Sequence, residues 1–309
     1  RHGITSCLQY TQSIAFGRYL LYNEGKKVVK TMKVAFLYDF DKTLSPKDMQ
    51  EYGFIEAIGF EDAGRFWSLV DQTAKEEKMD RIMAYLYEMV RQAKHHGVDL
   101  TREFLADFGK NVVLFPGVET WFSSINAYAS FLGIELEHYI VSSGLREIIE
   151  MTSIAKEFRA IYACEYLYGE DQIAVWPKLS INYTNKMQFI FRVNKGILDI
   201  FNDVDLNSFT PEKDRPVPLT RMVYFGDGLT DVPSMKLVKS NGGHSISVYT
   251  KKTKEASIEL AKHERVDFIA PADYSDDGEL MAIAKNILSH LFESDKLENK
   301  KWKEETGND

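Results

Sequence analysis

Three short apolar runs, each followed directly by a polar or acidic cluster, constrain the fold of this sequence more than any other feature. Lys33–Tyr38 precedes an acidic loop, His138–Val141 precedes a pair of serines, and Arg221–Phe225 precedes a Gly-Asp-Gly turn. Short apolar runs bounded by turn signals are typical of strands buried in a parallel sheet. Helical patterns separate these runs, and this alternation favours a doubly wound α/β sheet. Because open α/β sheets bind ligands where their strands end, we expect a functional site there.

The rest of the chain supplies further elements for such a sheet. We expect four more short strands, the first two paired as a hairpin, at Ile161–Tyr166, Ile173–Tyr183, Ser245–Tyr249 and Asp267–Ile269. We expect helices of the core at Val118–Phe131, Leu145–Ser153, Lys186–Phe201 and Glu279–Phe292. The segment Asp203–Thr220 is polar and contains prolines, which indicates a surface loop.

A different pattern follows the first strand. Between residues 46 and 111, apolar residues recur at three- and four-residue spacing, as in Phe66–Ala74 and Arg81–Lys94, which indicates an inserted helical cap. We therefore expect a discontinuous core at residues 32–45 and 112–292, a cap at 46–111 and a charged tail at 293–309. Residues 1–31 are weakly patterned, and we expect a lead-in of non-native origin, with Met32 as the initiator and a native helix at Ser13–Tyr22 as the alternative.

Composition excludes several classes of protein. The 309 residues carry a net charge of −8, so bulk electrostatics do not favour nucleic-acid binding. No apolar run approaches the roughly 18 residues that a membrane span requires. Cys7 and Cys164 lie far apart and form neither a metal-binding spacing nor a disulfide framework, which favours a cytoplasmic setting.

Asp39 and Asp41 directly follow the first apolar run. Residues two apart in an extended chain point the same way, so both carboxylates can face one pocket. Carboxylates this close repel each other unless a cation or a shared proton intervenes, and Mg²⁺ with its preference for oxygen ligands relieves that repulsion. One carboxylate can then attack phosphorus while the other transfers protons. A capped turn that includes Thr43 is the structural alternative.

A second acidic cluster, Gly226-Asp227-Gly228 with Asp231, follows the third apolar run. The glycines let the backbone approach an ion or a phosphate closely. Asp227 supplies another oxygen ligand, and Asp231 can reach back from the start of a helix. A Gly-Asp-Gly turn alone is common, and its position after a strand with a second aspartate is what indicates a binding site.

Hydroxyl and ammonium groups complete the candidate site. Ser142 is followed by Ser143 and Gly144, and a hydroxyl beside free backbone amides at a helix start binds anions, although a simple helix cap has the same sequence. The charge on a phosphoryl group also needs a fixed cation. Lys186 follows a strand end and is the favoured candidate, with Lys195 as the alternative.

In this order, the motifs resemble the four motifs of the haloacid dehalogenase (HAD) superfamily. DFDKTLS is similar to the family's Asp-x-Asp-x-Thr motif, YIVSSGLREI to its second motif, a downstream lysine to its third, and GDGLTD to its fourth. The position of the helical module, between the first and second motifs, resembles the C1-type cap of the phosphoserine phosphatase branch. The resemblance implies a Rossmann-like core, Mg²⁺ as cofactor and hydrolysis of a small phosphorylated metabolite by a monomer or homodimer.

The resemblance also implies a role for each motif residue. Asp39 is the expected nucleophile, which becomes an aspartyl phosphate, and Asp41 is the expected general acid and base. Ser142 and Lys186 are expected to hold the phosphoryl oxygens. The expected metal ligands are Asp39, Asp41 through its backbone carbonyl, Asp227 and Asp231. Further phosphate-binding positions are expected at Thr43, Ser143, Gly144 and Gly228, with Thr43 also supporting the first loop.

Two departures from that branch concern the substrate. The branch has a glutamate shortly after the first motif, where this chain has Asp48, and a carboxylate-binding arginine in the cap, which the stretch Ile82–Val90 lacks. Phosphoserine is therefore a poor candidate. Tyr85 and Tyr87 are candidates for lining a pocket for a choline-like or other apolar-bodied substrate, with packing in the helical core as the alternative. A phosphomutase and an inactive HAD-like binding protein remain alternative functions.

Overall fold

A computed structural model gives the fold of this protein and describes residues 31–305 of the chain. The lead-in and the helix at Ser13–Tyr22 lie outside the described residues, apart from Thr31. The sheet has seven strands in the order β4-β3-β2-β1-β5-β6-β7. Their bounds are Met32–Tyr38 for β1, Ile134–Leu145 for β2, Ala160–Tyr168 for β3, Ala174–Leu179 for β4, Met222–Gly226 for β5, His244–Tyr249 for β6 and Phe268–Pro271 for β7.

The strand order reverses at β1. From β1 the chain moves outward through β2, β3 and β4, then returns to the other side of β1 at β5 and continues through β6 and β7. The pairs β2–β3, β1–β5, β5–β6 and β6–β7 are parallel, and β3–β4 is the antiparallel hairpin. The expected doubly wound sheet and its hairpin are therefore confirmed. The reversal places the carboxyl end of β1 beside that of β5, where ligands bind in such sheets.

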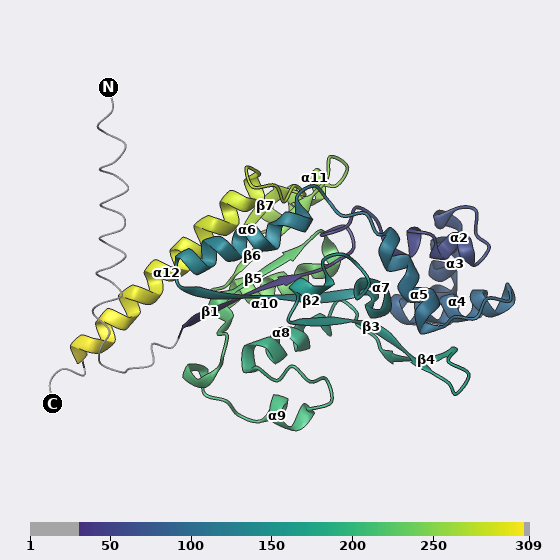
Figure 1. Ribbon diagram of the computed structural model, residues 1–309, viewed down its shortest axis with the longest axis horizontal. Coiled ribbons are helices and arrows are strands. Elements are labelled where there is room, and N and C mark those ends of the chain that lie inside the picture. The colour runs from purple at the N-terminus through teal and green to yellow at the C-terminus, as the bar shows by residue number, and fades with distance from the viewer. Residues whose placement is uncertain (1–30, 306–309) are drawn as a thin grey trace, which may run out of the picture. The chain divides into compact units, whose positions relative to one another are not determined.

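Helices cover both faces of this sheet (Figure 1). On one face lie α6 (Val118–Phe131) and α12 (Glu279–Glu305), and on the other lie α8 (Lys186–Lys195) and α10 (Val232–Ser240). The remaining helices of the core are α7 (Arg146–Ile149), α9 (Asp203–Asn207) and α11 (Lys254–Lys262). Within residues 31–305, no helix combines the length and the apolar character that membrane crossing demands.

The cap helices gather at one end of the sheet (Figure 1). They are α2 (Phe54–Ala57), α3 (Ala63–Glu76), α4 (Arg81–His95) and α5 (Arg102–Asp107). Asp62 and Asp80 cap α3 and α4 by accepting hydrogen bonds from backbone amides of the first turn. Short 3₁₀ helices at Met49–Glu51 and Phe108–Asn111 connect the cap to the core, and others lie at Ala155–Glu157, Glu212–Asp214, Leu219–Arg221 and Leu229–Asp231.

Helix α4 is hydrogen-bonded to the core at three places. The Tyr85 hydroxyl donates to the carbonyl of Ser143 at 2.6 Å, and the Tyr166 hydroxyl of β3 donates to the carbonyl of Leu86 at 2.7 Å. The third bond joins the Asn182 amide to the Asp80 carboxylate at 3.2 Å. Tyr85 and Tyr166 are buried, so their two bonds are largely shielded from water, whereas the bond of Asn182 is exposed. Together the three bonds fix α4 over the end of the sheet.

Several element bounds differ from those expected. The closing helix continues to Glu305 instead of ending at Phe292, because no helix-breaking residue interrupts the charged segment expected as a separate tail. The helix that begins at Lys186 ends at Lys195, because Gly196 adopts a left-handed φ of 70°.

Two other segments also differ. The strand expected to end at Val141 continues to Leu145, which pairs with Cys164 of β3, so the following helix is a single short turn. The polar segment expected as a loop contains α9, which the side chain of Asn202 caps by accepting from the Asp205 amide. Side-chain bonds and strand pairing, which local composition does not reveal, determine both differences.

A chain of hydrogen bonds fixes the end of β1 inside the core. The Trp121 indole donates to the Tyr38 hydroxyl at 2.9 Å, and the Tyr38 hydroxyl bonds to Nδ1 of His138 at 3.1 Å. The other ring nitrogen of His138 bonds to Oδ1 of Asn126 at 2.9 Å. Burial lowers the pKa of His138 to about 3, so the imidazole is neutral and can accept from Tyr38. Because Tyr38 directly precedes Asp39, this network positions the acidic loop.

We expect Tyr38→Phe to lower the free energy of unfolding by about 1–3 kcal/mol, because it leaves the buried Trp121 and His138 nitrogens without their partner. Tyr87→Phe is the matched control, since Tyr87 is 48% exposed. Urea unfolding of both variants measures the difference. Equal stability of the two variants would contradict the role of this network.

Candidate active site

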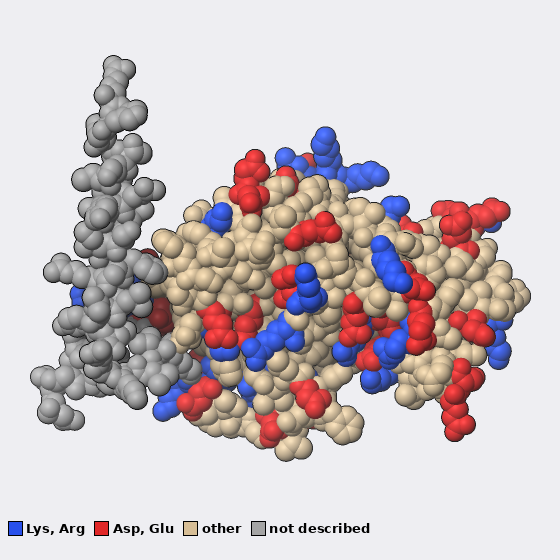
Figure 2. Space-filling model, in the orientation of Figure 1, with Lys and Arg blue, Asp and Glu red and all other residues tan. Residues whose placement is uncertain are grey.

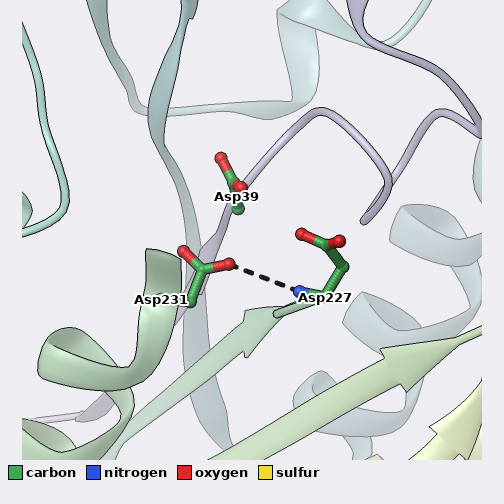
Figure 3. A group of neighbouring side chains, drawn as sticks. All are labelled: Asp39, Asp227 and Asp231. Carbon is green, nitrogen blue, oxygen red and sulfur yellow. Dashed lines mark hydrogen bonds between the residues drawn. The ribbon is translucent and has the colours of Figure 1, made fainter. Parts of the chain in front are cut away.

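Three aspartates converge where β1 and β5 end. Asp39 follows β1, Asp227 follows β5, and Asp231 lies at the start of α10. One carboxylate oxygen from each lies within 4.8 Å of the others, and Figure 3 shows the three side chains directed toward one another. The Asp227 amide donates to Oδ2 of Asp231 at 3.3 Å, which ties the second acidic cluster together. The parallel pairing of β1 with β5 is what brings these distant segments into one group.

Lys186 lies among these carboxylates. Its Nζ is 3.0 Å from Oδ1 of Asp39 and 2.8 Å from Oδ1 of Asp231, and the residue is only 1% exposed. Tyr224 of β5 donates a further hydrogen bond to the same oxygen of Asp231. The alternative, Lys195, donates instead to the carbonyls of Leu206 and Ser208, away from the aspartates. Of the two lysines, the structure thus brings Lys186 to the site.

The site holds more negative charge than one lysine balances. Burial, followed by the charge of Asp231, raises the pKa of Asp39 to about 6, although Lys186 opposes the shift. Burial and the charges of Asp231 and Asp39 raise the pKa of Asp227 to about 8. Lys186 itself is buried, which lowers its pKa, but Asp231 and Asp39 together raise it well above its usual value. A cation among these oxygens would relieve the repulsion.

The donor set fits a hard divalent cation. It consists of carboxylate oxygens alone, and Mg²⁺ and Ca²⁺ prefer oxygen ligands. The Asp41 carboxylate does not belong to this group, because its Oδ1 accepts from the Met49 amide at 2.9 Å. The expected contribution of Asp41 to a metal site is therefore limited to its backbone carbonyl. The described residues thus include an acidic triad able to hold a metal ion.

The first acidic loop is a tight turn around the carbonyl of Phe40. That carbonyl accepts from the amides of Thr43, Leu44 and Ser45, and Lys42 adopts a left-handed φ of 60°. Asp41 lies in this turn and is half-buried. Burial, then the charges of Asp48 and Asp39, raise the pKa of Asp41 well above its usual range. A carboxyl whose pKa is raised is better suited to act as a general acid than an ordinary carboxyl.

The serine loop contributes a hydroxyl donor. Ser142 is fully buried, and its Oγ accepts from the Gly144 amide at 3.0 Å, which leaves the hydroxyl hydrogen for an incoming acceptor. The expected set of free amides at a helix start is not formed, because β2 continues through this segment and the amide of Leu145 points to Sδ of Met49. A Cβ on Gly144 would lie 2.0 Å from Cε of Met49, so the Met49 side chain would have to move to accommodate a larger residue.

A cavity of about 230 Å³ lies between the cap and these loops. Its core side is formed by Asp39, Asp41, Ser142, Ser143, Gly144, Lys186, Asp227 and Gly228. Thr43 is fully buried, does not line the cavity, and binds Tyr274 through its carbonyl. Its expected contact with phosphate is therefore absent, and its position fits the expected support of the first loop. Gly228 lines the cavity, but its backbone is extended and a Cβ there would contact no other atom.

The cap side includes residues that the sequence did not single out, namely Gln50, Trp67 and Arg81. Arg81 directly precedes the stretch Ile82–Val90, which lacks an arginine, so the cap does present an arginine to the cavity. Its position after the capping residue Asp80, at the first turn of α4, is the sequence signal that could have identified it. Of the two candidate tyrosines, Tyr85 lines the cavity, whereas Tyr87 is 48% exposed and is not among the lining residues.

We compared the sequence and the fold of this protein with those of known proteins. No family model matches the sequence. An uncharacterized protein of Borreliella burgdorferi is 26% identical over 269 residues, which span 78% of this chain and 92% of that protein. A probable phosphoserine phosphatase of Vibrio cholerae has a similar structure, with a TM-score of 0.55 and 12% identity over 86% of this chain and 68% of that one. A HAD-family hydrolase of Salmonella enterica serovar Typhi has a TM-score of 0.51 and 15% identity, with coverage of 79% and 71%.

A substrate-bound phosphoserine phosphatase is similar over 82% of this chain and 98% of its own, with a TM-score of 0.50 and 16% identity. At such low identities, these similarities establish the fold alone. The protein thus shares its fold with a HAD-family hydrolase and with phosphoserine phosphatases. The fold class expected from the motifs is thereby confirmed.

We expect Gly226→Ala to weaken Mg²⁺ binding at least tenfold, because a Cβ at this position would lie 2.5–2.7 Å from the side-chain atoms of Asp231 and displace that carboxylate. Gly228→Ala is the matched control, since a Cβ there meets nothing within 4 Å and its φ of −164° suits any residue. Isothermal titration calorimetry of both variants with Mg²⁺ gives the affinities. Wild-type affinity in Gly226→Ala would show that the triad does not bind the ion.

Proposed function

We propose that this protein is a Mg²⁺-dependent phosphomonoester hydrolase that forms an aspartyl phosphate on Asp39. The observation that best supports the proposal is the position of the Asp39 carboxylate, which lines the cavity 3.0 Å from Nζ of Lys186 and within the acidic triad. A nucleophile beside a fixed cation and a metal site is the arrangement that phosphoryl transfer requires.

In this proposal, Asp39, Asp227, Asp231 and the backbone carbonyl of Asp41 would hold Mg²⁺. Asp231 also orients Lys186 and the Asp227 backbone. Bound Mg²⁺ would neutralise charge on the phosphoryl oxygens and so assist the displacement. The hydroxyl of Ser142 and the ammonium of Lys186 hold the same oxygens from the opposite side. Ser143, Gly144 and Gly228 line the phosphate end of the cavity, and the Gly144 amide reaches phosphate only if it releases Ser142.

Two steps complete the proposed reaction. An oxygen of Asp39 attacks phosphorus, the bond from phosphorus to the leaving oxygen breaks, and Asp41 gives its proton to that oxygen. Asp41, now a carboxylate, then takes a proton from water as the water attacks the aspartyl phosphate. Inorganic phosphate leaves, and both Asp39 and Asp41 return to their initial states. The raised pKa of Asp41 supports its place as the acid in the first step.

The proposal includes a small phosphorylated metabolite as substrate and action in the cytoplasm by a monomer or homodimer. The size of the cavity supports a small substrate. Figure 2 shows Lys and Arg interspersed with Asp and Glu over the visible face, which offers no broad basic patch to a nucleic acid there.

We expect Asp39→Asn to reduce phosphate release below about a hundredth of the wild-type rate, because the amide keeps the shape of the side chain and lacks the attacking charge. The measurement is release of inorganic phosphate from p-nitrophenyl phosphate with and without Mg²⁺, with circular dichroism to verify folding. Retention of a larger rate would contradict the assignment of the nucleophile. Isomerisation of a sugar phosphate by the wild type, without free phosphate, would favour a phosphomutase.

We expect Asp41→Asn to slow turnover by about 10²–10⁴-fold, the usual contribution of general acid–base catalysis. The loss should be larger for alkyl phosphates than for p-nitrophenyl phosphate, because nitrophenolate leaves without a proton. Steady-state kinetics with both kinds of substrate measure this difference. An equal loss for both would contradict the role of Asp41 as the acid in the first step.

A further inference from the structure

The charged side chains at the cap side of the cavity are Lys42 of the first acidic loop and Asp48 and Arg81 of the cap, and each has a partner of opposite charge. Nζ of Lys42 donates to both carboxylate oxygens of Asp48, at 2.9 and 2.7 Å. Nε of Arg81 lies 2.6 Å from the Asp71 carboxylate, and its guanidinium lies over the ring of Trp67. A leaving group with an ammonium or a carboxylate would have to compete with these internal partners.

Gln50 presents the opposite case, a polar group without a partner. It lines the cavity, is only 2% exposed, and its Oε1 has no hydrogen-bond partner among the described residues. A buried amide in this state is unfavourable unless a ligand completes its hydrogen bonding. The backbone at Gln50 is held beside the first acidic loop, because the amide of the preceding residue, Met49, donates to the Asp41 carboxylate. The uncharged amide both accepts and donates, which matches the two capacities of a hydroxyl group.

The volume of the cavity limits what lies beside Gln50. A volume of about 230 Å³ corresponds to about seven water molecules at about 30 Å³ each. A phosphoryl group and a metal ion with its remaining waters fill a large part of that space. Only a few non-hydrogen atoms of a leaving group fit in the remainder.

We propose that the leaving group is a small neutral alcohol with at least one further hydroxyl, and that Gln50 is the specificity-determining residue that binds this hydroxyl. The inference rests on the proposed phosphatase function and adds its substrate class. It disfavours zwitterionic leaving groups such as serine, because the cap-side charges are paired internally. It also disfavours choline-like cations, because the cap-side carboxylate of Asp48 already pairs with Lys42.

The test compares glycerol 3-phosphate with propyl phosphate, which has the same carbon chain without the hydroxyls. We expect the wild type to prefer glycerol 3-phosphate in kcat/KM by at least tenfold, and Gln50→Leu to remove most of that preference, mainly through KM. Tenfold is about the contribution of one well-formed hydrogen bond. Gln72→Leu is the matched control, since Gln72 is exposed on α3 and bonds to Glu76, and it should keep the wild-type preference.

A second variant tests the paired charges. Asp71→Asn releases Arg81 from its ion pair, and we expect it to raise kcat/KM for O-phosphoserine relative to glycerol 3-phosphate by several-fold. A wild type that prefers O-phosphoserine or phosphocholine would overturn the inference. An equal loss of both glycerol 3-phosphate and propyl phosphate hydrolysis in Gln50→Leu would also overturn it, since that result indicates a structural role.

The two proposals fail in different ways. If the wild type hydrolyses no phosphate monoester, including p-nitrophenyl phosphate, under any divalent metal, the phosphatase proposal itself is wrong. If it hydrolyses propyl phosphate as well as glycerol 3-phosphate, the phosphatase proposal stands and only the inference about Gln50 is wrong.

Discussion

The buried ammonium group of Lys186 is the interaction on which the site depends. It contacts two carboxylates that are themselves buried, and removal of one partner from a buried ion pair typically costs 3–5 kcal/mol. Three features of the fold make this contact possible. Helix α8 begins at Lys186, β1 and β5 are neighbours, and Gly226 leaves room for Asp231. The single lysine still leaves an excess of negative charge, and that excess is what makes the site suitable for a divalent cation.

The core and the cap differ in how they use charge. In the core, the carboxylates face one another, and burial and mutual repulsion raise the pKa values of Asp39 and Asp227. At the cap side, Asp48 pairs with Lys42 of the first acidic loop, Arg81 pairs with Asp71 of α3, and Gln50 is uncharged. Phosphoryl transfer needs charged groups close to the phosphorus atom. Selection of a neutral leaving group needs uncharged hydrogen-bonding groups instead. Because the core carries the reacting groups and the cap carries the groups that contact the leaving group, each set of side chains can be arranged without disturbing the other.

The spacing of apolar residues along the chain predicted the strands and helices whose formation depends on neighbouring residues. The apolar runs before Asp39 and Asp227 are strands, and α6 has the predicted bounds, because burial and periodicity are visible in the sequence. Spacing could not choose between Lys186 and Lys195, which are nine residues, or about two and a half turns, apart on one helix and so face opposite sides. Gln50 and Arg81 were missed because their places in the cavity follow from packing between distant segments. The bond from Trp121 to Tyr38, 83 residues apart, is hidden from sequence for the same reason.

The three hydrogen bonds between α4 and the core limit how the cavity can open. A swing of the whole cap would break all three and leave the carbonyls of Ser143 and Leu86 without their phenol donors. A bend confined to α2 and α3 would break none of them. That movement would instead break the bond from the Thr73 hydroxyl to Glu88 and the ion pair between Asp71 and Arg81, which join α3 to α4. Either way of opening the cavity therefore breaks polar contacts of α4, the helix that connects the rest of the cap to the core.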